Sequence, residues 1–157
     1  MLVIPELIWS NLLHEFRTLR RSVEQVAYLD GLDDGTTRLV TTVAFPNADL
    51  EPRSYRVSPA AMSEAGKHLR RLNLVRLAQV HTHPGEDVEH SPDDDRRAYS
   101  QEHGAISIVV PHYGRGTPAL DMCGFYVREV ASWNLIPYDQ LGATVTFMPS
   151  VFDFRRH

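Results

Sequence analysis

Segments with helical spacing of apolar residues alternate with short apolar segments of strand type along the chain. Leu12, Leu13 and Phe16 belong to the first helical pattern, which predicts an amphipathic helix over residues 5–21. Two Ser-Pro pairs, each a capping hydroxyl before a proline suited to the first helical position, predict further helices over 60–72 and 91–103. Strands are predicted over residues 24–29, 36–45, 55–57, 74–80, 106–110, 120–130 and 144–148. Because these elements interleave without a repeating period, we predict the α/β (α+β) class, with a mixed β-sheet flanked by helices.

The length and charge of the chain limit its number of domains and exclude some kinds of protein. Its 157 residues suit a single domain over 1–157, since a domain takes roughly 100–200 residues. A (β/α)₈ barrel of about 250 residues is excluded. With 16 Lys and Arg against 20 Asp and Glu, the formal net charge is −4, which argues against a surface for nucleic acid.

No segment predicts a targeting signal or a membrane span. The first nine residues contain Pro5 and Glu6 and no basic leader, which is unlike a secretory signal. The longest apolar stretches, such as residues 106–111, are far shorter than the roughly 20 residues that a membrane helix needs. We therefore expect a cytoplasmic protein with no membrane partner.

Cysteine and histidine usage limits the kind of metal site that the chain can form. Cys123 is the single cysteine beside eight histidines, so no internal disulfide can form and a reducing compartment is expected. We predict that Cys123 is a small buried hydrophobic residue. Any metal ion would have to be held by imidazole and carboxylate groups.

The stretch from His81 to Asp95 has the strongest functional signal. His81 and His83 lie at i and i+2 at the end of a predicted strand, so both side chains point to one side of the sheet. Asp94, in the first turn of the following helix, is placed to supply a third ligand and to leave one tetrahedral position for water, as in catalytic zinc sites. Position alone equally favours Asp94 as a capping-box acid for Ser91.

These residues resemble the zinc motif of the JAB/MPN family, whose catalytic form is called JAMM. The matching string is His-x-His-Pro-x6-Ser-x-x-Asp, from His81 to Asp94. The upstream string beginning at Glu24 is similar to the family's glutamate segment, although Ala27 stands where a glycine is usual and His90 where many members have proline. The similarity covers about residues 5–130 and implies the family's cytidine-deaminase-like, MPN-type architecture.

The resemblance implies a zinc hydrolase that cuts peptide or isopeptide bonds, with one Zn²⁺ per chain. His81, His83 and Asp94 would bind the ion, and Glu24 would hold the attacking water and act as the base. Ser91 would donate a hydrogen bond to the oxyanion. It could also cap its helix.

The resemblance also suggests the substrate. Relatives bind the C-terminal tail of a ubiquitin-like protein as an extended strand, and a carrier protein bearing a terminal amino acid is the other candidate. Short bacterial forms occur near activating and conjugating enzyme-like proteins, including antiviral defence systems, so such partners are expected. A non-catalytic MPN scaffold is the alternative, since such domains often serve as interaction modules.

Other metal-enzyme signatures do not fit. Amidohydrolase barrels need a longer chain after the His pair, and Gly85 and Glu86 replace the residues of a metallo-β-lactamase motif. His14-Glu15 lacks the second histidine of a zincin, because position 18 is threonine. His90, His112 and the C-terminal tail receive no assigned role.

Overall fold

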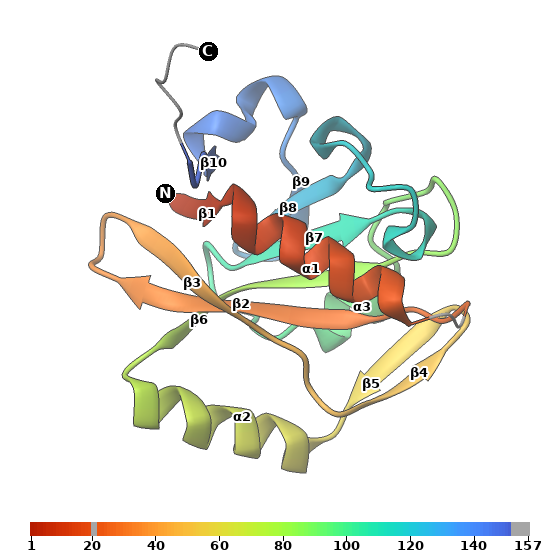
Figure 1. Ribbon diagram of the computed structural model, residues 1–157, viewed down its shortest axis with the longest axis horizontal. Helices are drawn as coiled ribbons and strands as arrows, with labels where there is room; N and C mark the ends of the chain where they lie inside the picture. Colours follow the sequence, from red (N-terminus) through yellow and green to blue (C-terminus); the bar gives the residue numbers. More distant parts are fainter. Residues whose placement is uncertain (20–21, 152–157) are drawn as a thin grey trace, which may run out of the picture.

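Eight of the ten strands among the described residues form one mixed sheet (Figure 1). The structure is a computed structural model that describes residues 1–19 and 22–151. The order across the sheet is β10-β1-β3-β2-β6-β7-β8-β9, and β4 and β5 form a separate hairpin. The neighbours β1/β10, β1/β3 and β6/β7 are parallel, whereas the other pairs are antiparallel. The strands are β1 (Leu2–Pro5), β2 (Val26–Asp33), β3 (Arg38–Ala44), β4 (Ala48–Glu51), β5 (Ser54–Val57), β6 (Val75–Thr82), β7 (Ile106–Val110), β8 (Gly124–Arg128), β9 (Trp133–Leu135) and β10 (Val145–Met148).

The main core lies between α1 (Glu6–Thr18) and one face of the sheet (Figure 1). The helix buries one apolar stripe, formed by Trp9, Leu12, Leu13 and Phe16. Alternate residues of the central strands, such as Ile106 and Ile108 of β7, complete this core. The predicted fold class is confirmed: the fold is a mixed sheet with helices on its faces.

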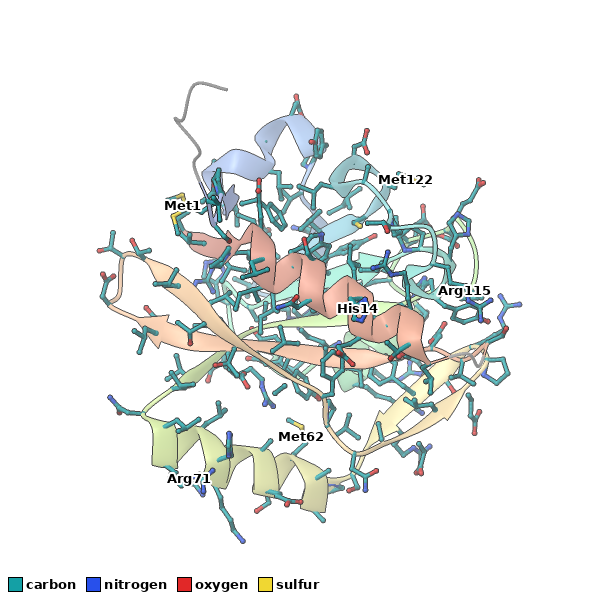
Figure 2. The ribbon with its side chains drawn as sticks, viewed as in Figure 1. Met1, His14, Met62, Arg71, Arg115 and Met122 are labelled. Atoms are coloured by element: carbon teal, nitrogen blue, oxygen red, sulfur yellow. The ribbon has the colours of Figure 1, made fainter. Side chains whose placement is uncertain are left out.

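The opposite face of the sheet is covered more loosely. It meets the β4–β5 hairpin and α2 (Pro59–Leu72), which begins at the Ser58 cap and ends at Asn73 in the left-handed conformation. Met62 points from α2 toward the sheet (Figure 2), where its sulfur accepts a hydrogen bond from the Tyr28 hydroxyl at 3.3 Å. No residue of α2 is fully buried. The site described below lies on this face.

The third helix is shorter than predicted. Instead of extending over residues 91–103, α3 covers Pro92–Arg97 and ends at Ala98, whose backbone is extended. The chain turns there because Tyr99 is held against β6: its backbone N–H donates to the Gln79 side chain at 3.0 Å, and its hydroxyl donates to the Leu77 carbonyl at 3.1 Å.

The second strand is longer than predicted. The sequence predicts a strand that ends at residue 29, but β2 continues to Asp33. Gly31 permits this because the Leu39 carbonyl of β3 packs where its side chain would be: a Cβ would lie 2.0 Å from that oxygen. Asp30 is stabilised by Arg76 of β6, with Nε and Oδ1 3.0 Å apart.

Three short strands were not predicted, and one predicted strand is divided. β1, β4 and β9 have four residues or fewer. The predicted strand over 120–130 is a 3₁₀ turn, η2 (Leu120–Met122), followed by β8. Two further 3₁₀ turns are η1 (His112–Gly114) and η3 (Tyr138–Ala143).

Some predictions fall outside the part of the chain that the structure describes. These are the end of the first helix at residue 21 and the C-terminal tail over 152–157. Among the described residues, no helix is both long enough and apolar enough to span a bilayer.

Candidate metal centre

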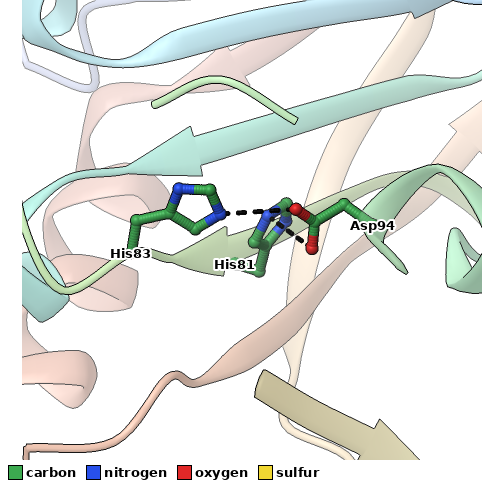
Figure 3. A group of neighbouring side chains, drawn as sticks. All are labelled: His81, His83 and Asp94. Carbon is green, nitrogen blue, oxygen red and sulfur yellow. Dashed lines mark ion pairs between the residues drawn. The ribbon is translucent and has the colours of Figure 1, made fainter. Parts of the chain in front are cut away.

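The end of β6 and the start of α3 bring His81, His83 and Asp94 together (Figure 3). The Nε2 atom of His81 lies 3.3 Å from Oδ1 of Asp94, and the Nε2 atom of His83 lies 3.4 Å from Oδ2. One ligand atom from each residue lies within 4.8 Å of the others. All three side chains are buried. The i, i+2 placement of the imidazoles therefore directs both of them at one carboxylate, as the strand pattern predicts.

The three residues fit a metal ion. Ligand bonds of roughly 2.0–2.2 Å place neighbouring ligand atoms of a tetrahedral zinc site about 3.3–3.6 Å apart, and both nitrogen-to-oxygen distances fall in that range. Neither ring nitrogen of the fully buried His81 has a hydrogen-bond partner with acceptable geometry. A buried polar atom without a partner is costly, and a cation between the three residues would satisfy Nε2.

A hydrogen bond orients the second imidazole. Nδ1 of His83 lies 3.0 Å from the backbone oxygen of Asp87, so Nδ1 carries the proton and donates it to that oxygen. The Nε2 lone pair is then directed toward Asp94. Metal-ligating histidines are commonly fixed by such a contact from their second ring nitrogen.

Asp94 forms the capping box with Ser91 and also faces the imidazoles. Its Oδ2 accepts a hydrogen bond from the Ser91 backbone N–H at 2.7 Å, and its own N–H donates to the Ser91 hydroxyl at 3.1 Å. The two roles that the sequence left open for Asp94 are therefore compatible in one conformation. The Ser91 oxygen is the acceptor in this pair, which leaves its hydroxyl hydrogen available for donation.

The protonation states of the group suit metal binding. Burial would raise the pKa of the Asp94 carboxyl, but its contacts with His81 and His83 hold that pKa well below the usual range. Burial lowers the pKa of the His81 imidazole. For His83, the contacts with Asp94 and the Asp87 backbone outweigh burial and raise the pKa. An anionic carboxylate beside a neutral His81 is the state in which these groups bind a cation.

Glu24 reaches this site from the segment before β2, because the next residue is fixed to β6. The backbone N–H of Gln25 donates to the Thr82 hydroxyl at 2.9 Å, and its carbonyl accepts from the Thr82 N–H at 3.0 Å. The Glu24 N–H donates to the carbonyl of Glu51 in the β4–β5 hairpin at 2.8 Å. The Glu24 side chain is thereby held between two elements, and it is 5% exposed.

The environment of Glu24 favours a proton on its carboxyl near neutral pH. Burial raises the pKa of Glu24 to about 7, and the charge of Asp94 adds to the rise while His83 and Arg53 oppose it. A carboxylate with a pKa close to neutrality can both accept and release a proton at pH 7.

A cleft of about 590 Å³ connects the site to solvent. Its lining includes Glu24, His83, Ser91 and Asp94, so the structure brings all of these predicted site residues to one cavity. His81 lies behind them, fully buried. A small pocket that shares Glu24, Ser91 and Asp94 with the cleft leads to a second hollow of about 690 Å³, between the hairpin and α3.

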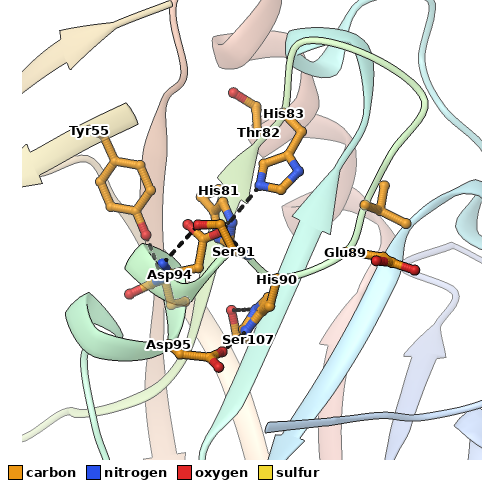
Figure 4. Close-up of polar contacts among 12 residues, drawn as sticks. Tyr55, His81, Thr82, His83, Glu89, His90, Ser91, Asp94, Asp95 and Ser107 are labelled. Atoms are coloured by element: carbon orange, nitrogen blue, oxygen red, sulfur yellow. Dashed lines mark hydrogen bonds and ion pairs between the residues drawn. The ribbon is translucent and has the colours of Figure 1, made fainter. Parts of the chain in front are cut away.

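His90 supports the loop between the two halves of the motif, and sequence reasoning left it unassigned. Its Nδ1 lies 3.0 Å from Oδ1 of Asp95 and its Nε2 lies 3.0 Å from the Ser107 hydroxyl of β7 (Figure 4). Its ring stacks on Tyr126 with 4.1 Å between centroids and lies 5.7 Å from the ring of His81. His90 therefore packs behind the ligands. The sequence singled it out because it stands where many members of the family that the motif resembles have proline.

The other residues singled out in the sequence lie elsewhere or act through their backbone. His14 is exposed on α1 (Figure 2). The His112 N–H donates to the carbonyl of Gly85 at 3.0 Å, at the edge of the cleft. Cys123 is buried as predicted, and burial raises the pKa of its thiol to about 12, which makes it a poor nucleophile.

Comparisons with known proteins were made for sequence and for structure. No model of a protein family matches the chain. Among curated proteins, the chain is similar to "Probable metalloprotease y4jG" of Sinorhizobium fredii (strain NBRC 101917 / NGR234), with 34% identity over 74 residues. The match covers 46% of this chain and 45% of that protein, so the chain matches less than half of that relative's length.

The fold is similar to a solved structure over its whole length. The solution structure of protein DSY2949 from Desulfitobacterium hafniense superposes with a TM-score of 0.73, covering 100% of this chain and 99% of that one. The two sequences are 19% identical, so the similarity shows a common fold alone. The chain therefore combines an α/β fold seen in another protein with a buried His-His-Asp group that fits a metal ion.

Proposed function

We propose that the chain is a zinc-dependent peptidase of the JAMM type, with His81, His83 and Asp94 as the ligands. The observation that supports this most is the convergence of three buried ligand atoms with Glu24 and Ser91 at one cleft. The similarity to a protein named as a probable metalloprotease supports the same chemistry. Four residues of the His-x-His-Pro-x6-Ser-x-x-Asp motif therefore lie close together with the upstream glutamate.

Glu24 is proposed as the proton carrier. A zinc ion held by His81, His83 and Asp94 would supply Lewis acidity, which would activate water as the nucleophile and polarise the scissile carbonyl. The Glu24 carboxylate accepts a proton from the attacking water and delivers it to the leaving nitrogen, so that a C–O bond forms as the C–N bond breaks. A raised pKa suits the return of that proton at neutral pH.

Ser91 is proposed as the oxyanion donor. Its oxygen accepts the Asp94 N–H, so its hydroxyl hydrogen is free to stabilise negative charge on the carbonyl oxygen of the substrate. The capping bonds fix the position of this hydroxyl before the substrate arrives. Preorganised donors of this kind contribute on the order of 10²–10³ in rate.

The proposed substrate is the C-terminal tail of a ubiquitin-like or carrier protein. The hollow of about 690 Å³ between the hairpin and α3 continues from the metal centre and offers a path for an extended chain. Within the described residues, β4 and β5 form a ladder only with each other, and Glu24 occupies the carbonyl of Glu51 at the end of β4, so the outer edge of β5 is the one proposed for strand addition. An associated role in a conjugation or antiviral defence pathway is part of this proposal.

Metal analysis and a single substitution test the function. The purified protein should bind about one zinc ion per chain, and His81→Ala should remove it. Glu24→Gln should keep the metal but should no longer hydrolyse ubiquitin-like fusion proteins. Mass spectrometry of the products measures this hydrolysis. A protein that binds no zinc and behaves identically after His81→Ala would contradict the proposal. Zinc binding with no cleavage of any fusion or peptide would favour a non-catalytic scaffold.

A further inference from the structure

Arg53 lies beside Glu24, the proposed base. Arg53 occupies the turn between β4 and β5 and lines both the cleft and the small pocket that Glu24 and Ser91 also line. Within residues 1–19 and 22–151, Arg53 has no ion pair and no hydrogen bond. Its charge acts on Glu24, where it opposes the rise in pKa that burial causes.

Hydrogen bonds hold the backbone of this turn at the cleft. The Tyr113 hydroxyl donates to the carbonyl of Pro52 at 2.9 Å, and the Tyr113 N–H donates to the carbonyl of His83 at 2.8 Å. One residue therefore connects a proposed metal ligand to the arginine turn. The carbonyl of Glu51, at the end of β4 just before the turn, accepts a hydrogen bond from the Glu24 N–H.

This connection depends on a strained segment. Tyr113 has φ +56° and the preceding His112 has φ +55°, a conformation that residues with side chains rarely adopt. Backbone strain of this kind persists where the surrounding structure enforces it, and it concentrates at functional sites. In this conformation, the N–H of Tyr113 bonds to the metal-centre side and its hydroxyl bonds to the turn.

The remaining charges of the cleft make Arg53 a selective anion site. Arg53 is the only Lys or Arg among the described residues that line the cleft, whereas Glu86, Asp87 and Glu89 line the loop side. A substrate carboxylate is repelled from that loop and attracted to the turn. The guanidinium can bind a carboxylate through two parallel hydrogen bonds.

The position of Arg53 also identifies the part of the substrate that it would contact. Under the proposed function, Glu24 delivers a proton to the leaving nitrogen, so the leaving group must lie next to Glu24. Arg53 lies next to Glu24 as well. A group that reaches Arg53 therefore belongs to the leaving portion of the substrate.

We infer that Arg53 binds a carboxylate on the leaving portion of the substrate, and that Tyr113 is the positioning residue for this contact. The inference rests on the proposed function and specifies its substrate class: peptides in which an acidic group closely follows the scissile bond. That group is either the free C-terminal carboxylate of a released residue or an acidic side chain.

Paired peptides test the inference. Zinc-loaded protein is incubated with a library of N-blocked peptides ending in Gly-Gly-Xaa, each made with a free C-terminal carboxylate and as the amide, and kcat/KM is followed by mass spectrometry. We expect the acids to exceed the amides by about 10- to 100-fold, the range of a charged hydrogen bond. Amidated Gly-Gly-Asp and Gly-Gly-Asn peptides distinguish the sources, because a preference for Asp over Asn identifies a side-chain carboxylate.

Four substitutions test whether Arg53 causes the preference for a carboxylate. Arg53→Gln should reduce the preference for the carboxylate to less than about twofold, and Arg53→Lys should retain part of it. Arg71→Gln removes an equal charge from α2, outside both the cleft and the hollow proposed for the substrate chain, and should leave the preference unchanged. Tyr113→Phe removes only the hydroxyl and should lower the preference mainly by raising KM for the carboxylate peptides.

The possible failures are distinguishable. Equal cleavage of the acid and amide peptides and of the Asp and Asn peptides would overturn the inference and leave the peptidase function intact. A preference that persists in Arg53→Gln would overturn it in the same way. Cleavage of no peptide by zinc-loaded protein would overturn the proposed function and this inference with it.

Discussion

Removal of the buried carboxyl of Glu24 should stabilise the metal-free protein at alkaline pH. The side chain is 5% exposed, and burial raises its pKa from 4.5 to about 7. A raised carboxyl pKa means that the folded state prefers the protonated form. The stabilising contribution of that proton is complete below the unfolded pKa near 4.5 and is lost as the pH rises through about 7.

The magnitude follows from the size of the shift. A change of one pKa unit corresponds to about 1.4 kcal/mol, so the full effect on the free energy of unfolding is roughly 3 kcal/mol above pH 8. At pH 5 the same linkage leaves a difference of less than about 1 kcal/mol. Glu24→Gln keeps a neutral side chain of similar shape. Its free energy of unfolding should therefore exceed that of the wild type by roughly 3 kcal/mol above pH 8 and by less than about 1 kcal/mol at pH 5.

Urea unfolding of both proteins with excess chelator, at pH 5 and pH 8.5, measures the difference. In thermal unfolding the gain at pH 8.5 corresponds to roughly 6–12 °C in Tm. Glu89→Gln is the matched control, because it makes the same substitution at an exposed side chain that lines the same cleft. An equal gain at the two pH values, or a larger gain at pH 5, would refute the assignment of a buried, protonated Glu24.

Three further predictions concern the ligands, the cap and the sheet. Asp94→Asn should abolish zinc binding measured by elemental analysis, whereas Asp95→Asn, in the same helical turn, should leave the metal content near one per chain. Ser91→Ala should lower the free energy of unfolding by about 1 kcal/mol through loss of the cap. The same substitution should lower kcat by a factor on the order of 10²–10³ through loss of the oxyanion donor. An unchanged kcat would remove Ser91 from the mechanism. Gly31→Ala should destabilise by about 3 kcal/mol or more in denaturant unfolding, because its Cβ would lie 2.0 Å from the Leu39 carbonyl, whereas Gly142→Ala, with no atom within 4 Å, should be tolerated.

Features that depend on neighbours along the chain were predictable. The i, i+2 spacing of His81 and His83 gave their common direction, because side chains alternate along any strand. The Ser58-Pro59 and Ser91-Pro92 pairs identified the starts of α2 and α3, since capping is a contact between residues three positions apart. The apolar stripe of α1 was equally evident from its period.

Features that depend on distant partners were not predictable. The strand β1 has four residues and exists because β10 and β3 pair with it from both sides. The early end of α3 results from hydrogen bonds between Tyr99 and β6, which compete with another helical turn. Local propensity contains no information about such partners, so three short strands were not predicted and the end of α3 was predicted too late.

The sequence by itself determined the chemistry available to this protein: two imidazoles and a carboxylate at metal-ligand spacing, a capping serine and an upstream glutamate. Only the tertiary structure decided that Glu24 is buried beside the group with a raised pKa, that the ring nitrogens of His81 find no hydrogen-bond partner among the described residues, and that Tyr113 holds the Pro52 carbonyl of the Arg53 turn at the cleft. The reason is physical. Ligand types and local spacing are properties of one short segment, whereas burial, electric field and the position of a turn arise from segments that fold together from distant parts of the chain.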